Sequence, residues 1–228
     1  GTPLSRRASG RARSARDREH GRVRPSFVTT QVREHHLFER FGTFVIIVLG
    51  ESVLQLVRGA SETTWTVAMW SAAGAGFAIL VGVWRLTFAY GFSAAPGVSR
   101  GAVDLRLAMP MHLVSTGSLV VLAASLGEIV RHAEHHVDGV WGWVAAAALA
   151  TYLLTTVVTG LAAGSPGRWV WGWGVPGVAF ALALGMVSEH LHPSVFVWLL
   201  LVPVGWLVLY GRGRLGTRRS VGEITQSR

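Results

Sequence analysis

The sequence predicts an all-α protein of the polytopic transmembrane class, and three observations lead to this prediction. The chain is 50% hydrophobic and only 14% charged over 228 residues, whereas soluble domains carry about 25% charged residues. Several apolar stretches reach the roughly 20 residues of helix that a bilayer core requires. The net charge of +9 is concentrated near the two ends of the chain, so the apolar stretches are left almost uncharged.

The first 34 residues are rich in Arg, Ser, Gly and Pro. Such a segment has too little apolar surface to offset its ordering entropy, so we expect a disordered basic tail over 1–34 on the cytoplasmic side. A sharper interpretation is that its arginines bind anionic lipid headgroups. A nucleic-acid partner is not expected, because no aromatic residues are interleaved with the arginines. No short apolar core with a cleavage site follows the tail, so it is not a signal peptide.

A transmembrane helical domain is predicted over 35–211, with about six spans. None of its apolar stretches alternates with the period of two that marks a barrel strand, so each is interpreted as a helix. The predicted spans, with ends uncertain by several residues, cover about 37–57, 65–90, 107–130, 140–163, 169–188 and 193–210.

The positions of the arginines predict the orientation of these spans. Ten arginines precede the middle of the first span, and five lie in the predicted basic C-terminal tail over 212–228. Because positive residues stay on the cytoplasmic side and an even number of spans returns the chain to it, both termini are expected in the cytoplasm. The expected location is therefore a membrane that borders the cytoplasm.

Residues within the spans predict how the helices pack. Small residues recur at every fourth position in three spans and would let helix backbones approach closely. These stripes are Gly74-Ala78-Gly82, Gly142-Ala146-Ala150 and Gly177-Ala181-Gly185. Pro176 and Pro203 lie inside spans and are expected to kink them, and such breaks can also mark transporter sites.

The stretch 35–58 carries the clearest candidate site. It reads His-His-Leu-Phe-Glu-Arg-Phe-Gly-Thr-Phe-Val-Ile-Ile-Val-Leu-Gly-Glu-Ser-Val-Leu-Gln-Leu-Val-Arg, a polar cluster followed by an apolar run with Glu51 near its middle. An acid at that depth is costly in hydrocarbon and is rarely kept without a polar partner or a wet cavity.

The segment from His36 to Ser52 resembles the signature segment of the bacterial low temperature requirement A (LtrA) family. The stretch from His112 to Glu128 resembles a later helix of that family more loosely, and the resemblance extends over about 35–212. It implies a multi-pass bacterial membrane protein whose biochemical activity is not established. It also implies further membrane helices before the signature, so this chain, which starts at Gly1, is interpreted as a C-terminal part or a truncated member.

Glu51 and Glu128 form the candidate polar intramembrane site, and both end a Leu-Gly-Glu triplet. The functional interpretation is that Glu51 lines a polar passage or a proton relay, with Glu128 nearer the outer interface. The alternative is a protonated carboxyl that is hydrogen-bonded inside the helix bundle. The resemblance favours a role for Glu51, because this acid belongs to the matched segment.

A second candidate cluster consists of His36, Glu39 and Arg40. Their spacing of three and four residues places them on one helical face at the inner membrane edge. The cluster would form either the cytoplasmic mouth of a polar path or an anchor at the lipid interface.

No catalytic residues, metal site or cofactor are predicted. The chain contains no Cys and no zinc-protease, Walker or dinucleotide motif, and no nucleophile elbow. His132 and His136 have a metal-ligand spacing, but we interpret the outer histidines as exposed or titrating groups. The protein is therefore not expected to be an enzyme.

Two functional hypotheses remain from the sequence. The first is a small-solute or ion transporter in which Glu51 is a buried titrating group. The alternative is a non-catalytic membrane scaffold or partner subunit that supports growth in the cold. The expected partners are the lipid bilayer and anionic headgroups, and a homo-oligomer is left open.

Overall fold

A computed structural model of the chain describes residues 27–90, 104–134, 136–165, 167 and 170–226. The chain divides into two compact units, Gly1–Leu37 and Phe38–Arg228, and the packing given below is that of the second unit. Residues 1–26 of the predicted basic tail lie outside the described residues. The first described helix begins inside the predicted tail, at Phe27.

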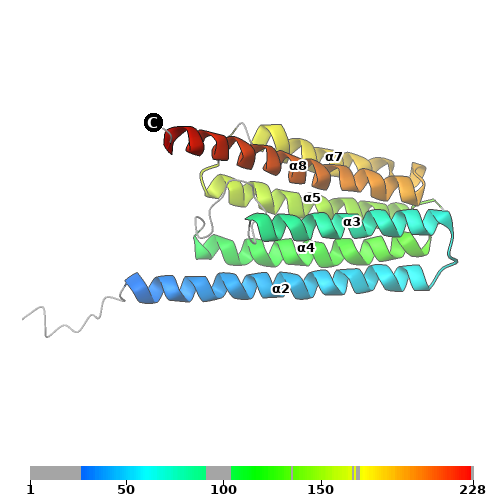
Figure 1. The fold of residues 1–228 in the computed structure, drawn as a ribbon. Coiled ribbons are helices and arrows are strands. Elements are labelled where there is room, and N and C mark those ends of the chain that lie inside the picture. Colours follow the sequence, from blue (N-terminus) through cyan, green and yellow to red (C-terminus); the bar gives the residue numbers. More distant parts are fainter. Residues whose placement is uncertain (1–26, 91–103, 135, 166, 168–169, 227–228) are drawn as a thin grey trace, which may run out of the picture. The chain divides into compact units, whose positions relative to one another are not determined.

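The described residues form helices and no strands (Figure 1), which confirms the predicted all-α class. In chain order the elements are α2 (Phe27–Ser61), α3 (Val67–Tyr90), α4 (Leu105–Arg131), α5 (Gly139–Ala162), the π-helical turn η1 (Val170–Gly174), α7 (Val175–Val187), the 3-10 turn η2 (Ser188–His190) and α8 (Pro193–Gln226). Helix α8 continues through most of the segment that was predicted as a C-terminal tail.

Five of the helices are long and apolar enough to cross a membrane. They match the first four and the sixth of the predicted spans, over Arg40–Ser61, Val67–Thr87, Arg106–Arg131, Gly139–Ala162 and Pro193–Tyr210. The remaining predicted span, 169–188, is not one continuous α-helix. It is built from η1, the 13-residue α7 and η2 in succession, and Pro176 lies in the first turn of α7, where its missing N–H is tolerated.

Helix starts are fixed by side chains as well as by apolar length. The Asp104 carboxylate accepts a hydrogen bond from the backbone N–H of Arg106 at 2.8 Å at the start of α4. Asp138 does the same for Val140 at the start of α5, also at 2.8 Å. Each aspartate satisfies one of the donors that the first turn of a helix leaves without an intrahelical partner.

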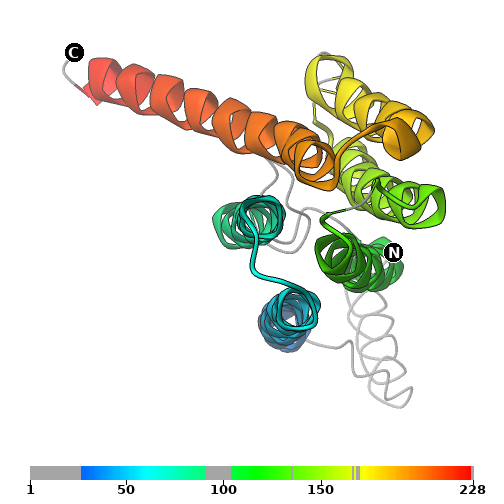
Figure 2. The same cartoon turned by 90° about the vertical axis from the view of Figure 1, so that its right-hand side faces the viewer.

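The core is formed by side chains of α2, α3, α4, α5, α7 and α8, and the most extensive helix contacts join α4 to α5, α3 to α8 and α5 to α7. Figure 2 looks along the helices and shows α4 beside α5 and α3 beside α8. The spans in α4 and α5 are 61% and 67% buried, whereas the span in α2 is 28% buried. Helix α2 is therefore the span with the largest share of its surface open.

Each of the three predicted small-residue stripes contains a glycine that lies close to a neighbouring element. A Cβ built on Gly185 of α7 would come within 3.1 Å of the Ala146 Cβ in α5, and one on Gly142 would come within 2.3 Å of Ser188. On α3, a Cβ on Gly82 would come within 2.6 Å of Val204 in α8. Gly74, at the other end of that α3 stripe, has nothing within 4 Å. The close approaches are set by single residues within the stripes.

Candidate functional site

Glu51 lies in the middle of the membrane span of α2, which covers Arg40–Ser61. Its side chain is exposed, and its carboxylate Oε1 accepts a hydrogen bond from Gln55 Nε2 at 2.7 Å. Because residues four apart share a helix face, the acid and the amide form a polar pair on one side of α2. Within the described part of the chain, Gln55 is the hydrogen-bond partner of Glu51. The prediction that Glu51 is buried is not confirmed by the helices of this chain.

The orientation of Glu51 follows from which side chains of α2 enter the bundle. The buried positions recur at intervals of three and four residues along one face, at Val45, Val48, Leu49, Ser52, Leu56 and Gly59. Glu51 lies about 100° around the helix from Ser52 and so falls outside that face. Ser52 itself donates its hydroxyl to the Val48 carbonyl at 2.7 Å, which satisfies the buried polar group within its own helix.

Helix α2 is held against α4 by two glycines that face each other. A Cβ on Gly59 would lie 2.1 Å from the Gly127 carbonyl oxygen, and one on Gly127 would lie 2.7 Å from the Gln55 carbonyl oxygen. No side chain larger than hydrogen fits at either position without moving backbone. Gly127 belongs to the second Leu-Gly-Glu triplet, so the glycine before Glu128 is a packing residue.

Glu128 lies one turn before the end of α4 and is joined to Arg131 in the last turn and to the C-cap residue His132. Both of its carboxylate oxygens accept hydrogen bonds from Arg131 Nη2, one of them at 2.6 Å. The Nδ1 atom of His132 lies 3.3 Å from the carboxylate and 3.1 Å from the Glu128 backbone carbonyl oxygen. The side chain of Glu128 is 20% exposed, so this acid is a partly buried member of an ion-pair cluster.

This cluster also joins loops that are far apart in sequence. Arg131 Nη1 lies 3.3 Å from Glu62 in the α2–α3 connection. Thr66 at the end of that connection donates its hydroxyl to Glu134 after α4. The α4–α5 connection is tied to the segment before α8 by a hydrogen bond from the Val137 N–H to the Leu191 carbonyl at 3.5 Å. The charged residues between these spans therefore gather at one end of the bundle, as the alternation of spans predicts.

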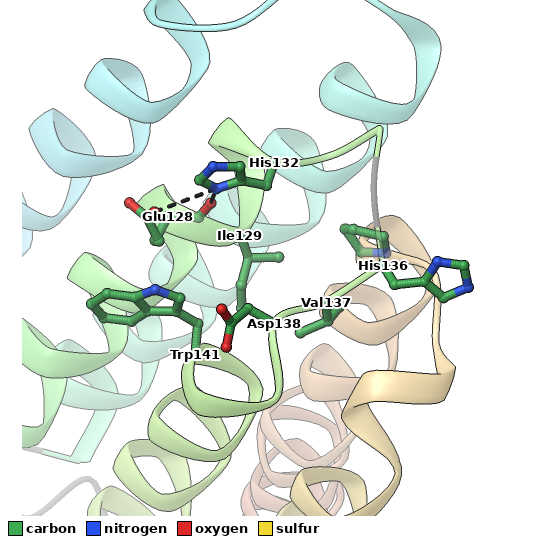
Figure 3. Close-up of a pocket in the computed structure, with 8 residues that line it drawn as sticks. Glu128, Ile129, His132, His136, Val137, Asp138 and Trp141 are labelled. Atoms are coloured by element: carbon green, nitrogen blue, oxygen red, sulfur yellow. Dashed lines mark hydrogen bonds and ion pairs between the residues drawn. The ribbon is translucent and has the colours of Figure 1, made fainter.

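A small pocket lies at this end beside Glu128 (Figure 3). Its lining combines carboxylates, imidazoles and an aromatic ring with apolar residues. The lining residues are Glu128, Ile129, His132, His136, Val137, Asp138, Trp141 and Pro193. Although His132 and His136 both line it, no group of three or more potential metal ligands occurs among the described residues. The pocket is too small to mark a ligand site, and its carboxylates are already engaged by Arg131 and by the start of α5.

At the opposite end of the α2–α4 contact, the two helices meet through aromatic side chains. The imidazole of His112 stacks on Phe41 with 4.4 Å between ring centroids and meets Phe44 edge-on at 5.8 Å. His112 is buried in α4. These ring contacts place His112 in the α2–α4 contact.

The second predicted cluster is described only in part. His36, Glu39 and Arg40 all lie within α2, and the Arg40 side chain is exposed. The side chains of His36 and Glu39 lie outside the described residues. Their role at the membrane edge therefore stays a prediction.

Several residues of these contacts were not singled out from the sequence. Gln55, Gly59 and Arg131 complete the Glu51 pair, the α2–α4 crossing and the Glu128 cluster. A signal was present for Gln55 and Arg131, because each lies one helical turn after an acid. For Gly59 no such local signal exists, since its partner is 68 positions away in the chain.

Long apolar helices, polar connections and intramembrane acids together define a multi-pass helical membrane protein. The model of the bacterial low temperature requirement A protein (LtrA) family matches residues 18–206, so the chain belongs to this family. The resemblance read from His36 to Ser52 is thereby confirmed. Comparisons with curated proteins and with solved structures found no match.

Proposed function

We propose that this protein is a transporter of a small solute or ion in the bacterial inner membrane and that Glu51 is its titrating group. The observation that carries this proposal is the Glu51–Gln55 pair in the middle of a membrane span. An ionisable side chain at that depth marks a substrate or proton path more often than a packing contact. The protein is accordingly proposed to act without catalytic residues or a cofactor.

The predicted span 169–188, which is interrupted by the π-helical turn η1, supports the same proposal. Transporters place substrate sites where membrane helices are interrupted, because the interruption frees backbone groups to bind a solute. In this chain the π-helical turn η1 is followed at once by α7 with Pro176 in its first turn. A π-helical turn has i→i+5 hydrogen bonds and is often found at functional sites.

The orientation is part of the proposal. With both termini in the cytoplasm, the Arg-rich ends meet the anionic leaflet, where each arginine near the surface contributes about 1 kcal/mol. The Glu128 cluster then lies on the outer side, and Arg40 and Arg106 lie on the inner side.

Proton flux into proteoliposomes tests the transporter proposal. Vesicles that hold a pH-sensitive dye and receive a potassium diffusion potential would acidify faster with the protein than without it. The Glu51→Gln variant keeps the hydrogen bonding of the side chain but cannot titrate, so it should reduce this flux to the level of empty vesicles. Glu62→Gln, an exposed acid after the same helix, is the matched control and should keep the flux.

The alternative function is a membrane scaffold or partner subunit that supports growth in the cold. It is favoured by the exposure of Glu51 on an open helix face, which suits contact with another protein. Equal flux for the wild-type protein and Glu51→Gln would remove Glu51 from the transport mechanism. Absence of flux for protons and for every solute tried would favour the scaffold.

A further inference from the structure

The open face of α2 carries a polar pair inside an apolar surface. Ile47 and Leu54 lie on either side of Glu51 at spacings of four and three residues and are 63% and 43% exposed. Phe44, one turn earlier, is 47% exposed. We name the residues Phe44, Ile47, Glu51 and Leu54 the Glu51 stripe. Their spacing of three, four and three residues is that of a helix face that packs along another helix.

Lipid can cover the apolar part of this stripe but not its centre. Acyl chains offer no donor or acceptor, so a carboxyl that faces them is paired by its own helix alone. In the described part of the chain that pairing is the one hydrogen bond from Gln55. A carboxyl has further acceptor positions, and the Gln55 carboxamide has a second N–H and a carbonyl oxygen. The face therefore requires a covering surface with both donors and acceptors at this depth.

We propose that the Glu51 stripe is the interface of a parallel homodimer, with a second copy of this chain as its occupant. The acid–amide pair is complementary to itself, because each copy brings a group that donates and a group that accepts. The second N–H of each Gln55 carboxamide can donate to the Glu51 carboxylate of the other copy. A two-fold axis along the membrane normal keeps both copies in the same orientation and brings each residue to its own counterpart.

The position of Glu51 among the apolar residues of the Glu51 stripe also supports a parallel dimer. A single polar residue among apolar contacts fixes the register of two parallel helices, because only one alignment pairs the polar groups. The interface needs no transport activity, and its test is therefore independent of the function proposed above.

Single cysteines test the interface directly, because the natural chain contains none. Ile47→Cys and Leu54→Cys should each form a disulfide-linked dimer on mild oxidation of native membranes that contain the full chain. Ile46→Cys is the matched control, since this neighbouring isoleucine is 51% exposed on a different side of α2. Its yield of dimer should be several-fold lower. Val202→Cys, 51% exposed on α8, should behave like Ile46→Cys.

A second pair of variants tests the role of the acid. In the Leu54→Cys background, Glu51→Leu should reduce the yield of dimer several-fold, and Glu51→Gln should keep it, because the amide still donates and accepts. Equal yields at positions 46 and 47 would overturn the proposal. A disulfide from position 47 to a different membrane protein would also overturn it, as would a dimer that Glu51→Leu leaves unchanged.

Discussion

Glu51 and Glu128 each end a Leu-Gly-Glu triplet, one in α2 and one in α4. The structure places the two acids in different environments. Glu51 is exposed and bonded to an amide, whereas Glu128 is mostly buried and bonded to Arg131 and His132. The preceding glycines differ in the same way. Gly50 has nothing within 4 Å, while Gly127 lies against the backbone of α2.

This difference shows that the role of a Leu-Gly-Glu triplet depends on where it lies along its helix and which face it occupies. In α4 the triplet lies one turn before the helix end and on the face toward α2, so its glycine packs and its acid meets charged neighbours. In α2 the triplet lies at mid-span and its acid faces away from the bundle. The same three residues therefore serve packing in one helix and present a polar group in the other.

The largest expected effect comes from the glycines. Gly127→Ala adds a Cβ 2.7 Å from a carbonyl oxygen of α2 and should destabilise the protein by about 1–3 kcal/mol, the usual cost of overpacking. Gly50→Ala meets no atom and should be neutral or stabilising by about 0.5–1 kcal/mol, because alanine favours helix. Thermal unfolding of the detergent-solubilised protein measures both. Equal destabilisation by the two variants would contradict the contrast.

A smaller effect is expected when Glu128 loses its charge. Glu128→Gln removes the ionic partner of Arg131, so the unfolding midpoint should fall by less than it does in Gly127→Ala. The ion pairs are partly exposed to solvent and are screened by salt. The difference between Glu128→Gln and the wild-type protein should therefore shrink as the ionic strength is raised, and a difference that is insensitive to salt would argue for a packing defect.

The smallest effect is expected for Glu51→Gln. The side chain is exposed, and glutamine keeps its hydrogen bond to Gln55, so the free energy of unfolding in detergent should change by no more than about 0.5 kcal/mol. The measurement is the same unfolding midpoint at two ionic strengths. A large loss of stability would show that Glu51 supports the fold, which would contradict its placement on the open face.

Much of the fold could be predicted from composition and length. Five predicted spans became continuous helices because each is long and apolar enough. The stripe with Gly142 and Ala146 correctly predicted a close helix contact, which the structure shows between α5 and α7, because small residues leave room for a second helix.

The site could be predicted only in part. The apolar run Val-Ile-Ile-Val-Leu before Glu51 is apolar on every side of the helix, so its sequence does not reveal which face enters the bundle. The Gly59–Gly127 contact depends on how two distant helices cross, and no local pattern encodes that crossing. The fifth predicted span was expected to be a helix kinked at Pro176, and the sequence did not predict the π-helical turn η1 before it.

The turn η1 has a consequence for the rest of α7. A wide turn holds one residue more than an α-helical turn before the backbone resumes its usual bonding. The side chains after it are thus rotated by about 100° relative to an uninterrupted helix. Gly177, Ala181 and Gly185 follow this turn within α7. A one-residue deletion there would turn a bulky flank of α7 toward α5, although every remaining side chain would be unchanged.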